Sequence, residues 1–412
     1  MDDRALLADG TTGAAYAAEP VAADADLQPL RRSELLAHLS AAFDLAEGRP
    51  EGHAARVALL GLEVARVLNL DRTTRERLFY AALLHDAHVV GERQEDRLEA
   101  AARAAIQLGL DAAVAQVIRA TRERWDGLGQ PDQLLDGQIP IEALCVAAAH
   151  WACDLAEDEH PLRARTRLLH ADDSELSRIG GPRVAAALRE ALRSDATWLH
   201  FWDDRLAAYA AREVVGDRPP AVLDVVEASA AMGDLVDAAL REPGRARHVA
   251  ETAVALADRL GLPEGQQRLL RVAGYLLDIG QLSVPREITE KPSILSVEEM
   301  EQMRRHPGLG SRIVERIPGM DQIALWIEMH HERPDGRGYP ELLDADEIPM
   351  PPRILAVADS YWALRAERPY RPAMTADQAL EVIDAGAGSQ YDAAVANALQ
   401  ALVRDADAEA AG

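Results

Sequence analysis

Two adjacent histidines, His330 and His331, stand immediately before a segment rich in turn-forming residues. Imidazole rings ligate transition metals, and two neighbouring rings can bind one ion or two. The following segment, 335–340, contains an Asp-Gly pair and a Gly-Tyr-Pro triplet, both of which are typical of tight turns. The spacing therefore predicts a metal site that is held rigidly at the end of a secondary-structure element.

The chain repeats itself, and the repeat places further metal-binding residue types at matching positions. The same number of residues separates His53 from His85 and Arg245 from Leu277, and an aspartate follows each second position. An Asp-Gly pair later in each copy is followed, again at equal spacing, by one more matched position. The matched positions are His53 with Arg245, His85 with Leu277, Asp86 with Asp278, and His150 with Asp359. Agreement at so many fixed spacings predicts two structurally similar domains.

Helices must position these residues. Apolar residues recur three and four positions apart in stretches such as 54–68 and 246–260, and aromatic residues make up only 4% of the chain. We therefore predict an all-α protein with two tandem helical bundles, over 29–205 and 219–404. The linker between them, 206–218, ends at a Pro-Pro pair, which stops a helix and stiffens the connection.

The ends of the chain, its charge and its cysteines narrow the class of protein. Residues 1–28 lack periodicity and predict a disordered arm, and 405–412 predict a flexible acidic tail. The net charge of −25 argues against binding to polymeric nucleic acid or anionic lipid. Cys145 and Cys153 give neither a disulfide framework nor a thiolate zinc site. Since no secretory leader and no apolar run of about 20 residues is found, we expect a cytoplasmic protein without membrane contact.

The second copy resembles the HD-GYP family of bacterial signalling proteins, which are metal-dependent phosphodiesterases acting on cyclic di-guanylate. The resemblance extends over nearly the whole copy, through the runs at 278–281, 306–307, 330–340, 353–359 and 368–371. It implies that this bundle has the HD-type fold and hydrolyses a phosphodiester. It also implies five metal ligands, which are Asp278, His306, His330, His331 and Asp359.

The resemblance assigns further roles around these ligands. Asp278, His330 and His331 would carry the catalytic step. The residues that would contact a cyclic dinucleotide are Lys291, Arg353, Arg371, Gly338, Tyr339 and Pro340. The cationic members suit this role because ammonium and guanidinium groups bind phosphate oxygens.

The first copy resembles the wider HD superfamily and predicts a second, simpler metal site. Its four donors are His53, His85, Asp86 and His150, while Thr121 and Arg122 stand where the second copy has its histidine pair. Imidazole and carboxylate donors suit iron, manganese, zinc or nickel. Such an ion lowers the pKa of a water molecule and offsets the charge of a phosphate. The alternative is a degenerate HD fold that holds no metal.

The second copy departs from the family at three positions, and these departures support a rival hypothesis. Arg245, Leu277 and Gln281 stand where the family has two histidines and a lysine. His248, one helical turn from Arg245, would replace a lost donor only if its helix rotated or shifted. One hypothesis is therefore a phosphohydrolase with an eroded site and weak or altered activity. The other is a non-catalytic scaffold that binds a nucleotide or a partner. Under either hypothesis, the order of the two copies suggests that the first regulates or dimerises the second, which would give a homodimer.

Overall fold

The computed structural model describes residues 30–46, 49–86, 94–156, 159–170, 173–201, 222–367 and 371–411. The predicted arm, 1–28, and the predicted linker, 206–218, lie outside these ranges. The prediction of an all-α protein is confirmed, since the strands of the described chain are two residues long. These strands, β1 (Leu30–Arg31) and β2 (Val222–Leu223), pair antiparallel and join the two halves of the chain. The described residues contain no helix that is long and apolar enough to cross a membrane.

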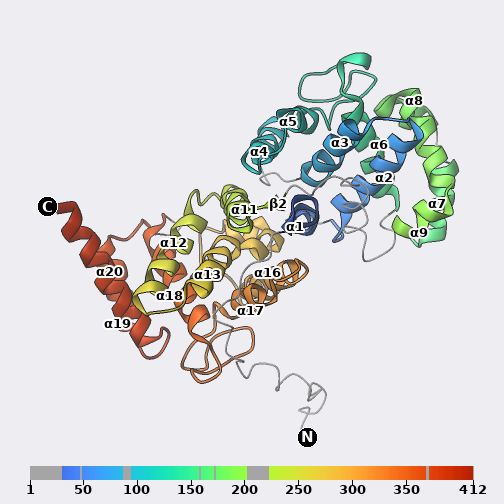
Figure 1. Cartoon of the computed structure of the whole chain (residues 1–412). Coiled ribbons are helices and arrows are strands. Elements are labelled where there is room, and N and C mark those ends of the chain that lie inside the picture. The colour runs from blue at the N-terminus through green and yellow to red at the C-terminus, as the bar shows by residue number, and fades with distance from the viewer. Residues whose placement is uncertain are drawn as a thin grey trace, which may run out of the picture.

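The first half of the chain forms one bundle of helices (Figure 1). Its elements are α1 (Arg32–Ala46), α2 (His53–Val67), α3 (Arg72–Leu84), α4 (Gln94–Gln107), α5 (Ala112–Arg119), η1 (Asp136–Gln138), α6 (Ile141–Ala156), α7 (Pro161–His170), α8 (Asp173–Arg193) and α9 (Asp195–Phe201). Helix α2 packs against α3, α6 and α8, so it lies at the centre of this bundle.

The second half forms a similar bundle. Its elements are α11 (Val225–Leu240), α12 (Arg245–Arg259), α13 (Glu264–Leu276), η2 (Ile279–Ser283), α14 (Arg286–Thr289), α15 (Val297–Met303), α16 (His306–Val314), α17 (Asp321–Met329), α18 (Met350–Arg365), α19 (Ala376–Ala385) and α20 (Ala393–Ala411). Helix α12 packs against α13 and α18, as α2 packs against α3 and α6. Most of the predicted tail, 405–412, belongs to α20.

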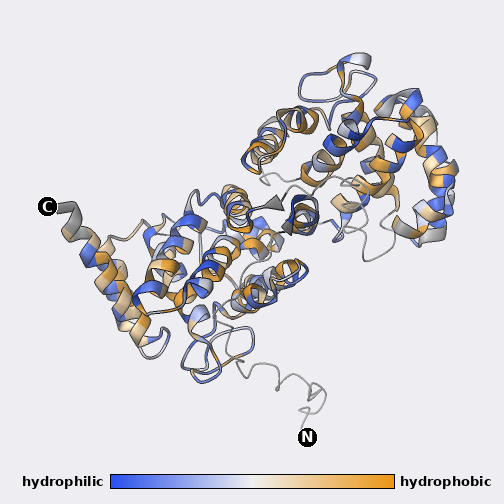
Figure 2. Cartoon of the chain, viewed as in Figure 1, coloured by the Kyte–Doolittle hydropathy of each residue, from blue (hydrophilic) through white to orange (hydrophobic). Residues whose placement is uncertain are grey.

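The chain forms these helices because each carries an apolar face together with local stop and start signals. Figure 2 shows hydrophobic and hydrophilic residues sharing the surface of individual helices, as an amphipathic pattern requires. Helices α2 and α12 both begin after a glycine in the left-handed region, Gly52 at φ 84° and Gly244 at φ 83°. Glycine adopts this conformation without the steric penalty of a Cβ, so both copies turn sharply before the first residue of the helix.

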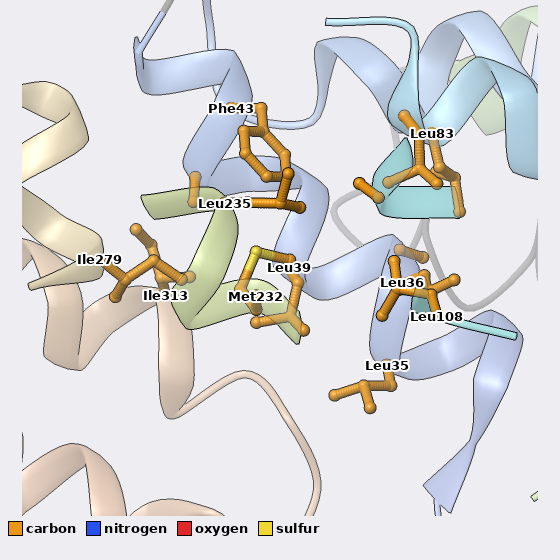
Figure 3. Packing of buried hydrophobic residues seen from close by; sticks show 14 of the residues in the cluster. Leu35, Leu36, Leu39, Phe43, Leu83, Leu108, Met232, Leu235, Ile279 and Ile313 are labelled. Carbon is orange, nitrogen blue, oxygen red and sulfur yellow. The ribbon is translucent and has the colours of Figure 1, made fainter. Parts of the chain in front are cut away.

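Helix α1 packs on both bundles. It contacts α2 and α3 of the first half, and η2 and α16 of the second. Figure 3 shows Leu39 and Phe43 of α1 beside Met232 and Leu235 of α11, and Leu36 beside Leu108. These side chains are at most 7% exposed. Each fully buried side chain of this size stabilises the fold by roughly 1.5–3 kcal/mol, so α1 joins the halves through a continuous apolar core.

Candidate metal centres

Three imidazoles and one carboxylate converge at the centre of the first bundle. His53 begins α2, His85 and Asp86 follow the end of α3, and His150 lies on α6. One ligating atom from each of the four lies within 4.8 Å of the others, and all four residues are buried. The Nε2 atom of His85 is 2.8 Å from Nδ1 of His150 and 3.2 Å from Oδ2 of Asp86. This donor set fits one divalent transition metal.

Burial keeps two of these imidazoles, those of His85 and His150, in the form that binds metal. It lowers the pKa of His85 well below its ordinary value and also lowers the pKa of His150. Nδ1 of His85 lies 2.6 Å from the carbonyl oxygen of Ala82. A carbonyl only accepts, so this Nδ1 carries the proton and the lone pair of Nε2 faces the cluster. A neutral imidazole aimed in this way is a ready metal ligand.

Two arginines at the rim of the first cluster were not identified from the sequence. Arg122 donates from Nη2 to Oδ1 of Asp86 over 2.8 Å. Nη2 of Arg49 lies 3.1 Å from Nε2 of His150, and Arg49 also forms an ion pair with Asp154. The signal for Arg122 was present, because it stands where the second copy has His331. Asp86 is therefore shared between the candidate metal position and a guanidinium.

A second group, of three histidines, lies in the C-terminal bundle. His306 begins α16, and His330 and His331 follow the end of α17. One ligating atom from each of the three lies within 4.8 Å of the others. Nδ1 of His306 is 2.8 Å from the oxygen of Met303, and Nδ1 of His330 is 2.5 Å from that of Ile327. Both Nδ1 atoms therefore carry the proton, because a carbonyl oxygen cannot donate.

The two Nε2 atoms of His306 and His330 face each other 3.3 Å apart. Because each Nδ1 donates to a carbonyl oxygen, each ring directs its second nitrogen, Nε2, toward the other ring. Burial lowers the pKa of His306 to about 4, and burial also lowers the pKa of His331 well below its ordinary value. Two imidazole nitrogens that converge in this way can both ligate one ion, so this geometry fits a metal site.

The two carboxylates predicted to complete this site are bound by an arginine. Arg245 begins α12 and is 9% exposed. Its Nε lies 3.2 Å from Oδ2 of Asp278, and its Nη2 forms an ion pair with Asp359 on α18. Oδ1 of Asp278 is also 3.7 Å from Nε2 of His306. Of the five predicted ligands, the three histidines therefore lie close enough to share one ion, whereas a guanidinium lies between the two aspartates, and this pair of carboxylates does not fit a second metal ion.

The remaining departures of the second copy have clear structural places. Leu277 is buried among apolar residues and offers no ligand. Gln281 donates to Oδ1 of Asp278 over 2.5 Å. His248 stacks on Trp362, with ring centroids 4.1 Å apart, and is not part of the histidine group, so in this structure it does not replace a donor.

The cationic residues predicted to contact phosphate have acceptors within the protein. Lys291 binds Glu299 over 2.5 Å. Arg353 donates to Asp392 over 2.7 Å and to the carbonyl of Ile348 over 2.8 Å. Arg371 donates to two main-chain carbonyls at the end of α18, those of residues 363 and 364.

The signature loop has the same construction in both copies. Glu332 accepts from the main-chain N–H groups of Glu341, Leu342 and Leu343 at 2.6–3.2 Å. Glu123 accepts in the same way from residues 132 and 134. Pro131 and Pro340 each follow a cis peptide bond. In the second copy the loop brings the ring of Tyr339 against His331, with centroids 4.8 Å apart.

Two further aspartates, which the sequence analysis overlooked, support the first residues of α2 and α12. Asp44 accepts from the N–H groups of Gly52 and Ala54 over 2.9 and 3.0 Å. Asp237 accepts from Ala246 over 2.9 Å. Burial raises the pKa of both aspartates to about 7. Asp44 lies nine residues before His53 and Asp237 lies eight before Arg245, so the two aspartates are one position out of register and the equal spacings of the repeat do not reveal them.

Two segments of the chain match models of the HD domain, over residues 51–151 and 232–395. The chain is 26% identical to the 3'3'-cGAMP-specific phosphodiesterase 3 of Vibrio cholerae, over 85% of this chain and 90% of that protein. It is 38% identical to the cyclic di-GMP phosphodiesterase response regulator RpfG of Xanthomonas campestris, over 35% of this chain and 39% of that protein. It is 36% identical to a cyclic di-GMP phosphodiesterase of Thermotoga maritima, over 36% of this chain and 41% of that protein.

A solved structure shares the fold along nearly the whole chain. The crystal structure of the cyclic GMP-AMP specific phosphodiesterase V-cGAP3 of Vibrio cholerae superposes with a TM-score of 0.64. The superposition covers 91% of this chain and 98% of that one, at 23% sequence identity. Both halves therefore have the HD-type fold that the resemblance implied.

Proposed function

We propose that this chain, which belongs to the HD-GYP family of HD-domain proteins, hydrolyses a phosphodiester bond of a cyclic dinucleotide at its C-terminal histidine group. The full-length relative from Vibrio cholerae is named for this class of substrate, as are the relatives that match the second half. The observation that carries the proposal is the pair of Nε2 atoms of His306 and His330 facing each other at 3.3 Å.

His306, His330 and His331 would hold the ion, which is iron, manganese, zinc or nickel by the chemistry of its donors. When bound, it would lower the pKa of a water molecule and offset the charge of the phosphate. The residues of the chain supply the rest. The carbonyls of Met303 and Ile327 fix two of the rings in the required tautomer. The ring of Tyr339 restricts His331 to one orientation.

Asp278 is the proposed proton acceptor. Burial alone would raise its pKa, but Arg245 and His306 together hold the pKa of this carboxyl below its ordinary value. It is therefore ionised at neutral pH. Its Oδ1 reaches to 3.7 Å from Nε2 of His306, so the carboxylate stands at the edge of the histidine group. A base in this position can take a proton from an attacking water molecule.

The first cluster would hold a separate ion. One donor atom from each of its four residues lies within 4.8 Å of the others, and the arginines Arg49 and Arg122 contact this cluster at its rim. We assign this cluster a supporting role, because the signature loop of the first half lacks the histidine pair. Its metal would stabilise the first bundle, to which α1 and the second bundle are joined.

Hydrolysis is tested by incubating the purified chain with manganese or ferrous iron and either cyclic di-GMP or 3'3'-cGAMP. Formation of linear dinucleotide, followed by chromatography, is the expected result. Replacing His330 and His331 together with alanine should abolish it, while His170→Ala, on the surface of the first bundle, should not. If the intact chain gives no linear product at high concentration with any of these metals, the hydrolase proposal fails.

A second candidate is a scaffold that binds the dinucleotide without cleaving it. The buried ion pairs of Arg245 favour it, because they bind two carboxylates that would otherwise serve the metal. Calorimetry with cyclic di-GMP and 3'3'-cGAMP separates the candidates. Saturable binding that persists in EDTA and is not followed by turnover supports the scaffold.

A further inference from the structure

We infer that the guanidinium of Arg245 takes the place of a metal ion in the C-terminal site, so that this bundle carries a covalently attached cation between Asp278 and Asp359. The inference concerns the site at which hydrolysis is proposed, and it adds that at most one ion, bound by the histidine group, belongs there. Metal content and thermal stability test it, so it can fail or succeed whether or not the chain cleaves a dinucleotide.

Buried negative charge surrounds this guanidinium. Three carboxylates surround it, with Oε2 of Glu242 at 3.0 Å and Oδ2 of Asp278 at 3.2 Å, and Asp359 also in contact. Each of the four side chains is at most 14% exposed. Negative groups buried this closely need a compensating cation. Arg245 supplies it permanently, since its guanidinium does not lose its proton in a protein.

In the first copy, the positive charge is arranged differently. Arg49 and Glu242 occupy matching places, because their N–H groups donate to the main-chain carbonyls of Asp44 and Asp237. His53 stands where the second copy has Arg245 and offers a neutral donor instead of a positive charge. Also in the first copy, His150 stands where the second copy has Asp359. The first site therefore has one carboxylate and three imidazoles facing its centre, and the second site has an arginine there with extra carboxylates around it.

Both histidines that donate at the matched positions of the first copy are replaced in the second copy, by Arg245 and Leu277. A histidine at position 245 would direct a ring toward Asp278 and Asp359, and a histidine at position 277 would add the neighbouring donor, as His53 and His85 do in the first copy. Both donors are absent together in the second copy, and Leu277 is packed into the core. In the second copy, the absence of both histidine donors therefore goes together with the presence of the guanidinium.

The test compares metal content and thermal stability in full-length chains. Both are measured in a His85→Gln background, which removes a donor from the first cluster. Into this parent the pair Arg245→His and Leu277→His is introduced, and metal is counted by mass spectrometry after gel filtration. We expect the paired variant to gain about one equivalent of manganese, iron or zinc over the parent. In EDTA its melting temperature should fall by roughly 5–10 °C, and saturating metal should restore most of this loss.

Two further variants make the result decisive. Arg245→Lys keeps a positive charge, so its metal content should stay at that of the parent. Arg247→Ala, on the same helix, removes an exposed arginine that binds Asp234 over 2.6 Å, and it should change neither metal content nor the response to metal. A folded paired variant with the metal content of the parent overturns the inference. If the paired variant does not fold, the parent and Arg245→Lys decide, and two tightly bound ions in either chain refute the inference.

Discussion

His150 and Asp359 occupy matching places in the two bundles, and each is in contact with an arginine that comes from a different position in its copy. His150 lies 3.1 Å from Arg49, which precedes α2, whereas Asp359 pairs with Arg245, the first residue of α12. The duplicated fold has therefore kept its donor positions while the charges around them have diverged.

The arginine at the rim of the first cluster should compete with metal. Arg122→Ala removes the guanidinium that binds Asp86 over 2.8 Å. A hydrogen bond to a charged group contributes about 1.5–3 kcal/mol, so the metal affinity of this cluster should rise on the order of tenfold. Competition with a fluorescent chelator measures the change. Arg124→Ala, which removes a pairing with Asp126, is the matched control and should leave the affinity unchanged. A weaker affinity in Arg122→Ala would show that the arginine supports the site instead.

In the absence of metal, stability should fall as the solution becomes acidic. Burial lowers the pKa of His306 from 6.5 to about 4, so between these pH values the unfolded chain binds a proton that the folded chain does not. Stability therefore decreases as pH falls from 6.5 toward 4 and is insensitive to this group above 6.5. Urea unfolding in EDTA at pH 7, 6 and 5 measures the slope. His306→Gln should make it shallower, and an unchanged slope would contradict the assignment.

The contact between η2 and α16 should be intolerant of a single methyl group. A Cβ on Gly280 would lie 2.0 Å from the carbonyl oxygen of His306. Gly280→Ala should therefore displace the start of α16, destabilise the fold by about 1–3 kcal/mol and lower the metal content of the histidine group. Gly308→Ala is the control, because its Cβ would meet only Glu328, at 3.9 Å. Chemical unfolding and metal analysis distinguish the two, and equal behaviour would argue against a tight contact.

The signature loop should depend on the carboxylate of Glu332. Its two oxygens accept three main-chain N–H groups, and their loss in Glu332→Ala leaves these donors unsatisfied. We expect a loss of about 3 kcal/mol in the free energy of unfolding, together with a weakened stack of Tyr339 on His331. Denaturant titration and tyrosine fluorescence report the two effects. Glu298→Ala, an exposed carboxylate at the start of α15, should cost less than about 1 kcal/mol, and a similar loss in both variants would refute the role of the loop.

Much of the fold and of the donor set could be predicted from the sequence. Helical periodicity can be read directly from the sequence, and so can the equal spacing of His53, His85 and Asp86 and of their counterparts in the second copy. Both are found in the structure. The equivalence of Glu123 and Glu332, at matching positions of the two copies, could be predicted for the same reason. The matched positions were correct because a duplicated fold keeps the number of residues between its core contacts.

The role of Arg245 could not be predicted in the same way. The sequence indicates only that an arginine at a ligand position repels a cation. Its ion pairs with Asp278 and Asp359 require the start of α12, the end of α13 and the middle of α18 to meet, and periodicity does not give this meeting point. The same limit applies to Arg353. Its partner Asp392 is distant in the sequence, and its partner Ile348 lies in the loop before α18.

Sharing α1 between the bundles means that the molecule does not divide where its sequence does. If a protease cut the chain between residues 201 and 222, the two fragments would remain associated, because Leu39 and Phe43 of the first pack against α11 of the second. A C-terminal fragment produced alone would instead expose the apolar side chains of Met232 and Leu235, which α1 covers in the intact chain. Dissecting the activities of the two halves therefore calls for point substitutions in the intact chain.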